Sequence, residues 1–220
     1  MHEELGAAAL SYETSWFLIT ILRSHLVRNQ IQDGVAQLTQ HVFSAFCDAT
    51  GGDMRHGVAL QFYDGQRAML LCRCAILLGD EGALKETLGV KGAAGTMVCS
   101  LCSNVVGVNS DLAGRAGALV DHAEFDLKRW VLHTDASLVA NQRHLCAQHG
   151  SCSKEAFKLL QQALGMNHCP LGVLAADPVD TFGFCPSTGI MYDWMHCYLV
   201  AGLVHAEARA CARRCHPRSI

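Results

Sequence analysis

The first part of the chain combines a short apolar segment with an amphipathic one. Residues Ser15 to Arg23 are rich in aromatic and β-branched side chains, which predicts a buried strand. From Asp33 to Asp48 the apolar positions recur at intervals of three and four, which predicts a helix. The Gly-containing turn at 50–53 ends that helix.

The next segment has the pattern of a β-hairpin. Apolar residues alternate with small or polar ones over 58–62, and an Asp-Gly turn precedes the apolar run from Ala68 to Leu78. We expect the second strand to be buried. It ends at Gly79, and Ala83 to Leu88 predicts a short helix preceded by acids, which the helix dipole favours. Asp80 is therefore expected at the C-terminal tip of a strand.

The pattern in the second half of the chain is weaker. Asp121 to Trp130 favours a helix, and Lys154 to Leu164 predicts a helix with one apolar face. A last helix is predicted to begin at Asp193, its N-cap, and to run towards Arg209. Residues 210–220 are expected to form an irregular end.

Composition narrows the class of protein. Half of the 220 residues are apolar and only 17% are charged, which predicts a folded α/β or α+β chain rather than a disordered one. A formal net charge of −3 provides no electrostatic footprint for nucleic acid. With 12 Cys and no signal peptide, we expect an intracellular, reduced protein with free thiols or metal ligands. No apolar run approaches the roughly 18 residues of a membrane span.

Two local features offer chemistry, and the first is Asp80. Its ordinary role is that of a helix N-cap or turn residue. The functional role is that of a ligand of Mg²⁺, which takes a few carboxylates and leaves its other positions to water and phosphate oxygens. One Asp alone cannot hold such a site.

The second feature is the Cys99-Ser100-Leu101-Cys102 segment, whose spacing is that of half a zinc knuckle. The segment is also compatible with a pair of buried small apolar residues, or with a redox Cys-x-x-Cys that has a depressed thiolate pKa. The segment HLCAQHGSC, which contains His144 and His149, is a candidate source of the remaining zinc ligands. Asp193 and His196, considered singly, are an N-cap and a first-turn residue.

Taken in order, these motifs resemble one family. The Asp80-Glu81 pair, the position of Cys99 nineteen residues after Asp80, the segment GAAGTMVCSLC and the later DWMHC at 193–197 are similar to the RNase H-like transposases of the Transib and CACTA kind. The catalytic subunit of the V(D)J recombinase is a relative of these transposases. The resemblance spans roughly Ser15 to Glu207.

The resemblance implies an incomplete RNase H-like fold with a mixed sheet and a helical, zinc-binding insertion. Residues 1–88 would form the partial core and 89–220 the insertion. Asp80 would be the second of three acids that bind two Mg²⁺ ions for attack on a DNA phosphodiester. Cys99 and Cys102 would bind a structural Zn²⁺, and Asp193 and His196 would lie near the DNA.

The chain also departs from the family pattern. The first acid belongs at the end of a strand before Ser15, and the final Glu and a His-x4-His pair belong beyond the DWMHC helix. We therefore expect a transposase fragment that has one catalytic acid of three and is inactive alone. Where it functions, we expect it in the nucleus with DNA as its partner. A homodimer is possible. No membrane and no small-molecule cofactor are expected. The alternative is a non-catalytic zinc-binding interaction module that uses Cys99, Cys102 and the His144–His149 segment.

Overall fold

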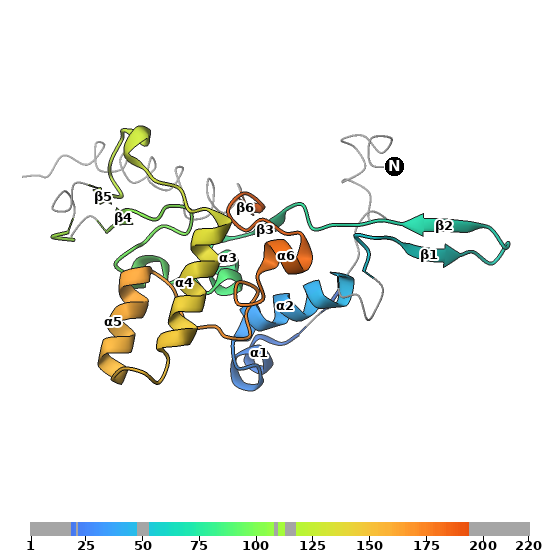
Figure 1. Ribbon diagram of the computed structural model, residues 1–220, viewed down its shortest axis with the longest axis horizontal. Helices are drawn as coiled ribbons and strands as arrows, with labels where there is room; N and C mark the ends of the chain where they lie inside the picture. Colours follow the sequence, from blue (N-terminus) through green and yellow to red (C-terminus); the bar gives the residue numbers. More distant parts are fainter. Residues whose placement is uncertain (1–18, 21, 48–52, 108–109, 113–117, 194–220) are drawn as a thin grey trace, which may run out of the picture.

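The computed structural model describes residues 19–20, 22–47, 53–107, 110–112 and 118–193. Within these ranges helices combine with three two-stranded sheets, so the chain is α+β and the coarse fold class is confirmed (Figure 1). The helices are α1 (Ser24–Gln30), α2 (Gly34–Cys47), α3 (Glu81–Leu88), α4 (Asp135–Gln148), α5 (Lys154–Leu164) and α6 (Pro178–Phe182), with 3₁₀ turns η3 (Gly92–Ala94) and η4 (Leu127–Arg129). The strands are β1 (Val58–Gln61), β2 (Arg67–Leu70), β3 (Leu77–Gly79), β4 (Val105–Val106), β5 (Val120–Asp121) and β6 (Ile190–Tyr192).

The start of the described chain does not form the predicted buried strand. Ile19 and Leu22 are 58% and 45% exposed, and neither belongs to a strand. The β-branched composition favours a strand only where a neighbouring strand and a covering layer exist, and the described residues supply neither here. The expectation is wrong for these residues, whereas 15–18 and 21 lie outside the described residues. The helix expected next is confirmed as α2, which buries Ala36, Phe43 and Cys47.

The hairpin is confirmed, but its second strand is exposed. Val58 of β1 pairs with Leu70 of β2 in antiparallel register, and the turn contains Gly65 at φ +83°. Met69 is 54% exposed, and Figure 1 shows the hairpin extending away from the helices. No described layer covers the strands, so the apolar run from Ala68 to Leu78 does not form one buried strand.

β3 and β6 form the parallel pair that positions the candidate site. Leu77 lies opposite Ile190 and Gly79 opposite Tyr192. The backbone N–H of Asp193 donates to the carbonyl of Gly79 at 2.8 Å, which continues the pairing past the last strand residue. Two segments more than a hundred residues apart in sequence are thereby held side by side.

Helix α3 follows β3 directly, as predicted. The carboxylate oxygen Oδ1 of Asp80 accepts a hydrogen bond from the backbone N–H of Ala83 at 2.6 Å, so Asp80 is the N-cap. Gly89 ends the helix at φ +67°. Leu84 and Leu88 are buried, which anchors the helix to the molecule.

The second half is more helical than its pattern predicted. Helix α4 begins with a capping box between Thr134 and Ser137 and was not predicted. Helix α5 was predicted and is confirmed. The helix expected from Asp121 to Trp130 is wrong, because this stretch contains only β5 and the single turn η4. The helix expected after Asp193 and the irregular end at 210–220 lie outside the described residues.

One large apolar core joins elements from both halves of the chain. Phe43 of α2 contacts Phe182 and Phe184 edge-on, with ring centroids 5.6 and 5.2 Å apart. The buried members of this core are Phe43, Cys47, Leu88, Val90, Leu138, Leu145, Met166, Val173, Leu174, Phe182 and Phe184. A smaller core contains Cys102, Val105 and Val120. The division of the chain at residue 88 stays a prediction.

In the described ranges, none of the helices has both the length and the apolar character needed to cross a membrane.

Candidate functional site

Two of the predicted site residues lie at one edge of the β3–β6 pair. Asp80 follows β3 and Asp193 follows β6, directly after the paired residues Gly79 and Tyr192. The carboxyl ends of adjacent parallel strands form a common edge, where ligands of open α/β sheets bind. The sequence placed each Asp beside its own motif, and the strand pairing brings the two together.

The N-cap role of Asp80 is confirmed, and it leaves part of the carboxylate unused. The side chain is half-buried, and among described residues its only hydrogen bond is the one to Ala83. An ionised carboxylate has about four acceptor positions, so a cap bond to one oxygen does not prevent a ligand from binding the other. The neighbouring Glu81 forms an ion pair with Lys85 instead. The metal-binding role of Asp80 stays a prediction.

A cavity of about 910 Å³ lies beside this edge. Glu81 and Tyr192 line it on the side of the strand ends, and Cys99 and Ser100 line it on the side of the cysteine pair. The hydroxyls of Tyr192 and Ser100 are hydrogen bonded, which ties β6 to the cysteine segment. The acidic and thiol motifs therefore border the same cavity.

The cysteine segment forms a tight turn. The backbone N–H of Leu101 points to the sulfur of Cys99, with an N···S distance of 3.4 Å. Cys102 is buried, and this burial, together with the nearby Cys99 thiol, raises the pKa of Cys102 to about 12. A redox Cys-x-x-Cys needs a depressed thiolate pKa at its nucleophilic cysteine, and the redox hypothesis stays a prediction. A bound cation would reverse this shift, because coordination deprotonates a thiol.

The two histidines proposed as further zinc ligands lie on other elements. His144 is exposed on α4, and His149 follows that helix and stacks on His168 with centroids 4.3 Å apart. Within the described part of the chain, no three His, Cys, Asp or Glu side chains are grouped as metal ligands would be. The expected zinc site, with four ligands from among Cys99, Cys102, His144, Cys146 and His149, is thus not assembled there. His196 lies outside the described residues.

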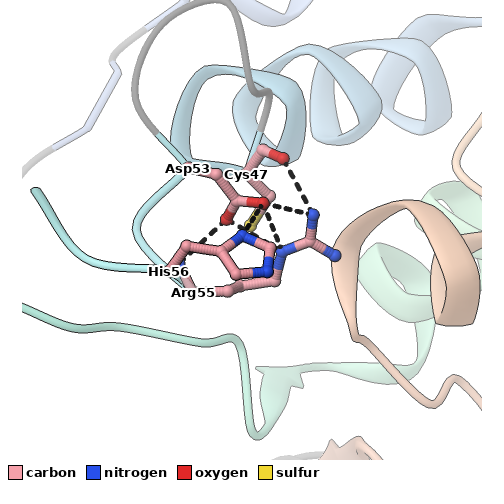
Figure 2. Close-up of polar contacts among 4 residues, drawn as sticks. All are labelled: Cys47, Asp53, Arg55 and His56. Carbon is pink, nitrogen blue, oxygen red and sulfur yellow. Dashed lines mark hydrogen bonds and ion pairs between the residues drawn. The ribbon is translucent and has the colours of Figure 1, made fainter.

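A partly buried ion pair was not predicted from the sequence. Arg55 donates from Nε to Asp53 at 2.9 Å and from Nη2 at 2.5 Å, and also from Nη2 to the carbonyl of Cys47 at 3.2 Å (Figure 2). Nδ1 of His56 lies 3.0 Å from Asp53. The Arg55 hydrogen bonds, and more weakly that of His56, hold the pKa of Asp53 well below its usual range. The only sequence signal was three polar residues close together after a helix, which resembles an ordinary turn.

Comparisons of the chain with protein-family models, with curated proteins and with solved structures found no match.

Proposed function

We propose that this chain supplies part of the active site of an RNase H-like DNA transposase or recombinase of the Transib and CACTA kind. Asp80 is the residue that binds Mg²⁺. The observation that carries the proposal is the parallel β3–β6 pair, which brings Asp80 and Asp193 to one edge beside a large cavity. Mg²⁺ sites in phosphoryl chemistry commonly use one or two carboxylates and leave the remaining positions to water and phosphate oxygens.

The residues of this chain prepare such a site in two ways. The Ala83 N–H holds one oxygen of Asp80, which fixes the direction of its carboxylate. The Asp193 N–H bond to Gly79 fixes the neighbouring strand end. When bound, Mg²⁺ would supply positive charge to a phosphodiester and align water or a 3′-hydroxyl for attack.

The described residues do not provide a full catalytic set. No third carboxylate or imidazole completes a metal-binding group around Asp80 and Asp193 within the described ranges. Two Mg²⁺ ions held by so few acids would repel each other and stay hydrated. We therefore expect the chain alone to bind a divalent ion without cleaving DNA. The proposal carries with it DNA as the partner, a nuclear location and a structural Zn²⁺ at Cys99 and Cys102.

The test is Mn²⁺ binding, measured by electron paramagnetic resonance as the loss of free-ion signal. Asp80→Asn should weaken binding, because it removes the charge while Asn still caps α3. The matched control is Asp126→Asn, since Asp126 is also an N-cap: it caps the 3₁₀ turn η4 and accepts a 3.1 Å bond from the Lys128 N–H. Equal Mn²⁺ binding by the wild type and both variants would contradict the proposal.

The second candidate function is a non-catalytic zinc-binding interaction module. The observation that favours it is the Cys99 turn, in which the Leu101 N–H points to the sulfur. Such N–H groups stabilise a thiolate, which is the form that binds Zn²⁺. In this alternative the metal holds the turn and the cavity wall in place, and Asp80 serves only as a helix cap.

Zinc stoichiometry separates the two functions. Cys99→Ser should abolish bound zinc under both hypotheses, with the exposed Cys152→Ser as control. Loss of zinc in His144→Ala as well would support the self-contained module of the alternative. Retention of zinc in His144→Ala, together with loss of Mn²⁺ in Asp80→Asn, would support the transposase proposal.

A further inference from the structure

A second cavity lies at the base of the hairpin, away from the Asp80 edge. Its volume is about 700 Å³, and it is lined by Arg55, Leu71, Cys72, Arg73, Ala75 and Gly183. Two of these side chains are guanidinium groups, and no acidic side chain lines the cavity within the described ranges. The remaining walls are small or apolar, which strengthens electrostatic attraction inside the cavity.

Arg55 is held in place before any ligand arrives. Its Nε and Nη2 atoms are engaged by Asp53 and by the carbonyl of Cys47. Figure 2 shows the third guanidinium nitrogen turned away from Asp53, with no contact drawn to it. The Arg55 side chain is 24% exposed, so part of it can be reached from the cavity. A guanidinium that is already oriented loses little conformational entropy when it binds an anion.

Arg73 and Gly183 complete the arrangement. Arg73 is exposed and has no hydrogen bond or ion pair with any described residue. Gly183 has φ +66°, and a Cβ there would lie 3.4 Å from Cδ of Arg55 and 4.0 Å from Nη1. The absence of a side chain at this position keeps the Nη1 edge of Arg55 open. Asp53 offsets one of the two positive charges, so the cavity keeps a net charge of about +1.

We propose that this cavity binds a phosphate group, supplied by the backbone of DNA. The phosphate would accept hydrogen bonds from Nη1 of Arg55 and from the fork of Arg73, since planar guanidinium donors match phosphate oxygens. The two arginines and the cavity indicate a phosphate group as the ligand, and the choice of DNA as its source rests on the proposed function. The cavity would hold the DNA duplex at a place separate from the Asp80 edge.

Cys72 reports on occupancy without any mutation. This thiol lines the cavity and is exposed, whereas Cys152 is exposed elsewhere on the molecule. A short DNA duplex should slow alkylation of Cys72 by iodoacetamide several-fold and leave Cys152 unchanged, as measured by mass spectrometry of the peptides. Protection by inorganic phosphate or pyrophosphate but not by DNA would overturn the choice of DNA. Protection by none of them would overturn the site.

A variant pair measures the contact itself. Arg73→Ala should weaken duplex binding about tenfold in fluorescence anisotropy, the loss expected for a charge-assisted hydrogen bond. The slope of log K against log[salt] should also fall by roughly 0.9, which corresponds to one phosphate. The control is Arg67→Ala, which removes another exposed arginine, on β2, that does not line the cavity. Equal losses in the two variants would overturn the site.

The two proposals fail in different ways. Asp80→Asn should not change protection of Cys72, because Asp80 does not line this cavity. If the wild type and Asp80→Asn bind Mn²⁺ equally, while DNA still protects Cys72, the transposase assignment is removed and the phosphate site is kept. If Asp80→Asn weakens Mn²⁺ binding, but no ligand protects Cys72 in the wild type, the phosphate site is overturned and the transposase proposal is kept.

Discussion

The phenol of Tyr192 is hydrogen bonded to the hydroxyl of Ser100, the residue that follows Cys99. This contact joins the end of β6 to the cysteine turn across a separation of 92 residues. The strand end and the turn are therefore connected at the wall of the 910 Å³ cavity, which both Ser100 and Tyr192 line. We therefore expect a substitution at Cys99 or Cys102 to affect a site that uses Asp80 and Asp193.

The Tyr192 contact predicts a measurable loss of stability on removal of one oxygen. Tyr192→Phe leaves the buried Ser100 partner without its hydrogen bond, which should lower the free energy of unfolding by about 1 kcal/mol. Urea denaturation followed by circular dichroism measures the change. Tyr63→Phe is the control, because Tyr63 is fully exposed at the hairpin and should show no effect. Equal stability of Tyr192→Phe and the wild type would show that the contact contributes nothing.

The Asp53 ion pair predicts an acid-dependent stability. Hydrogen bonds from Arg55 lower the pKa of Asp53 in the folded state, so its contribution is fully present above the unfolded-state pKa of about 4. That contribution is lost as the pH falls further, towards the lowered folded-state pKa. Asp53→Asn should be less stable than the wild type at neutral pH, and the gap should close in acid. Denaturant titrations from neutral to acidic pH measure this stability difference, and Asp64→Asn, at an exposed side chain, is the control.

The stacked histidines predict a second pH dependence, at milder acidity. Burial, and then the proximity of His149, lower the pKa of His168. The unfolded chain therefore takes up a proton at higher pH, near 6.5, and stability should fall as the pH drops below that value. His168→Gln should flatten the change in denaturation midpoint between neutral and mildly acidic buffer. His144→Gln, at an exposed residue of α4, should retain the pH dependence of the midpoint. The same pH dependence in His168→Gln as in the wild type would show that another group causes it.

The aromatic core predicts the largest loss of stability. Phe182 is 1% exposed and packs edge-on against Phe43. Phe182→Ala should therefore destabilise the fold by about 3–5 kcal/mol through the lost contacts and the cavity left behind. Phe125→Ala, at a side chain that is 95% exposed, should stay within about 0.5 kcal/mol of the wild type. Thermal unfolding of the two variants decides whether this core stabilises the protein.

Local pattern alone was enough for the elements whose signals lie within a few residues. The apolar spacing before Cys47 predicted α2, the Asp-Gly turn at Gly65 predicted the hairpin, and Asp80 was placed at a strand tip followed by a helix. These features depend on backbone propensity and capping, which neighbouring residues determine. Burial was predicted less well, because it depends on which layer covers a segment. Ile19 and Met69 are apolar in sequence but exposed in the structure.

Only the tertiary structure decided which motifs meet. The sequence by itself determined that Asp80 ends a strand and that Cys99 and Cys102 share a turn, because both are local properties. The pairing of β3 with β6 placed Asp193 beside Asp80, and the folding of the 71–76 segment placed Arg73 in the same cavity as Arg55. Contacts between distant residues depend on strand register and on packing of the shared core, which no short stretch of sequence specifies.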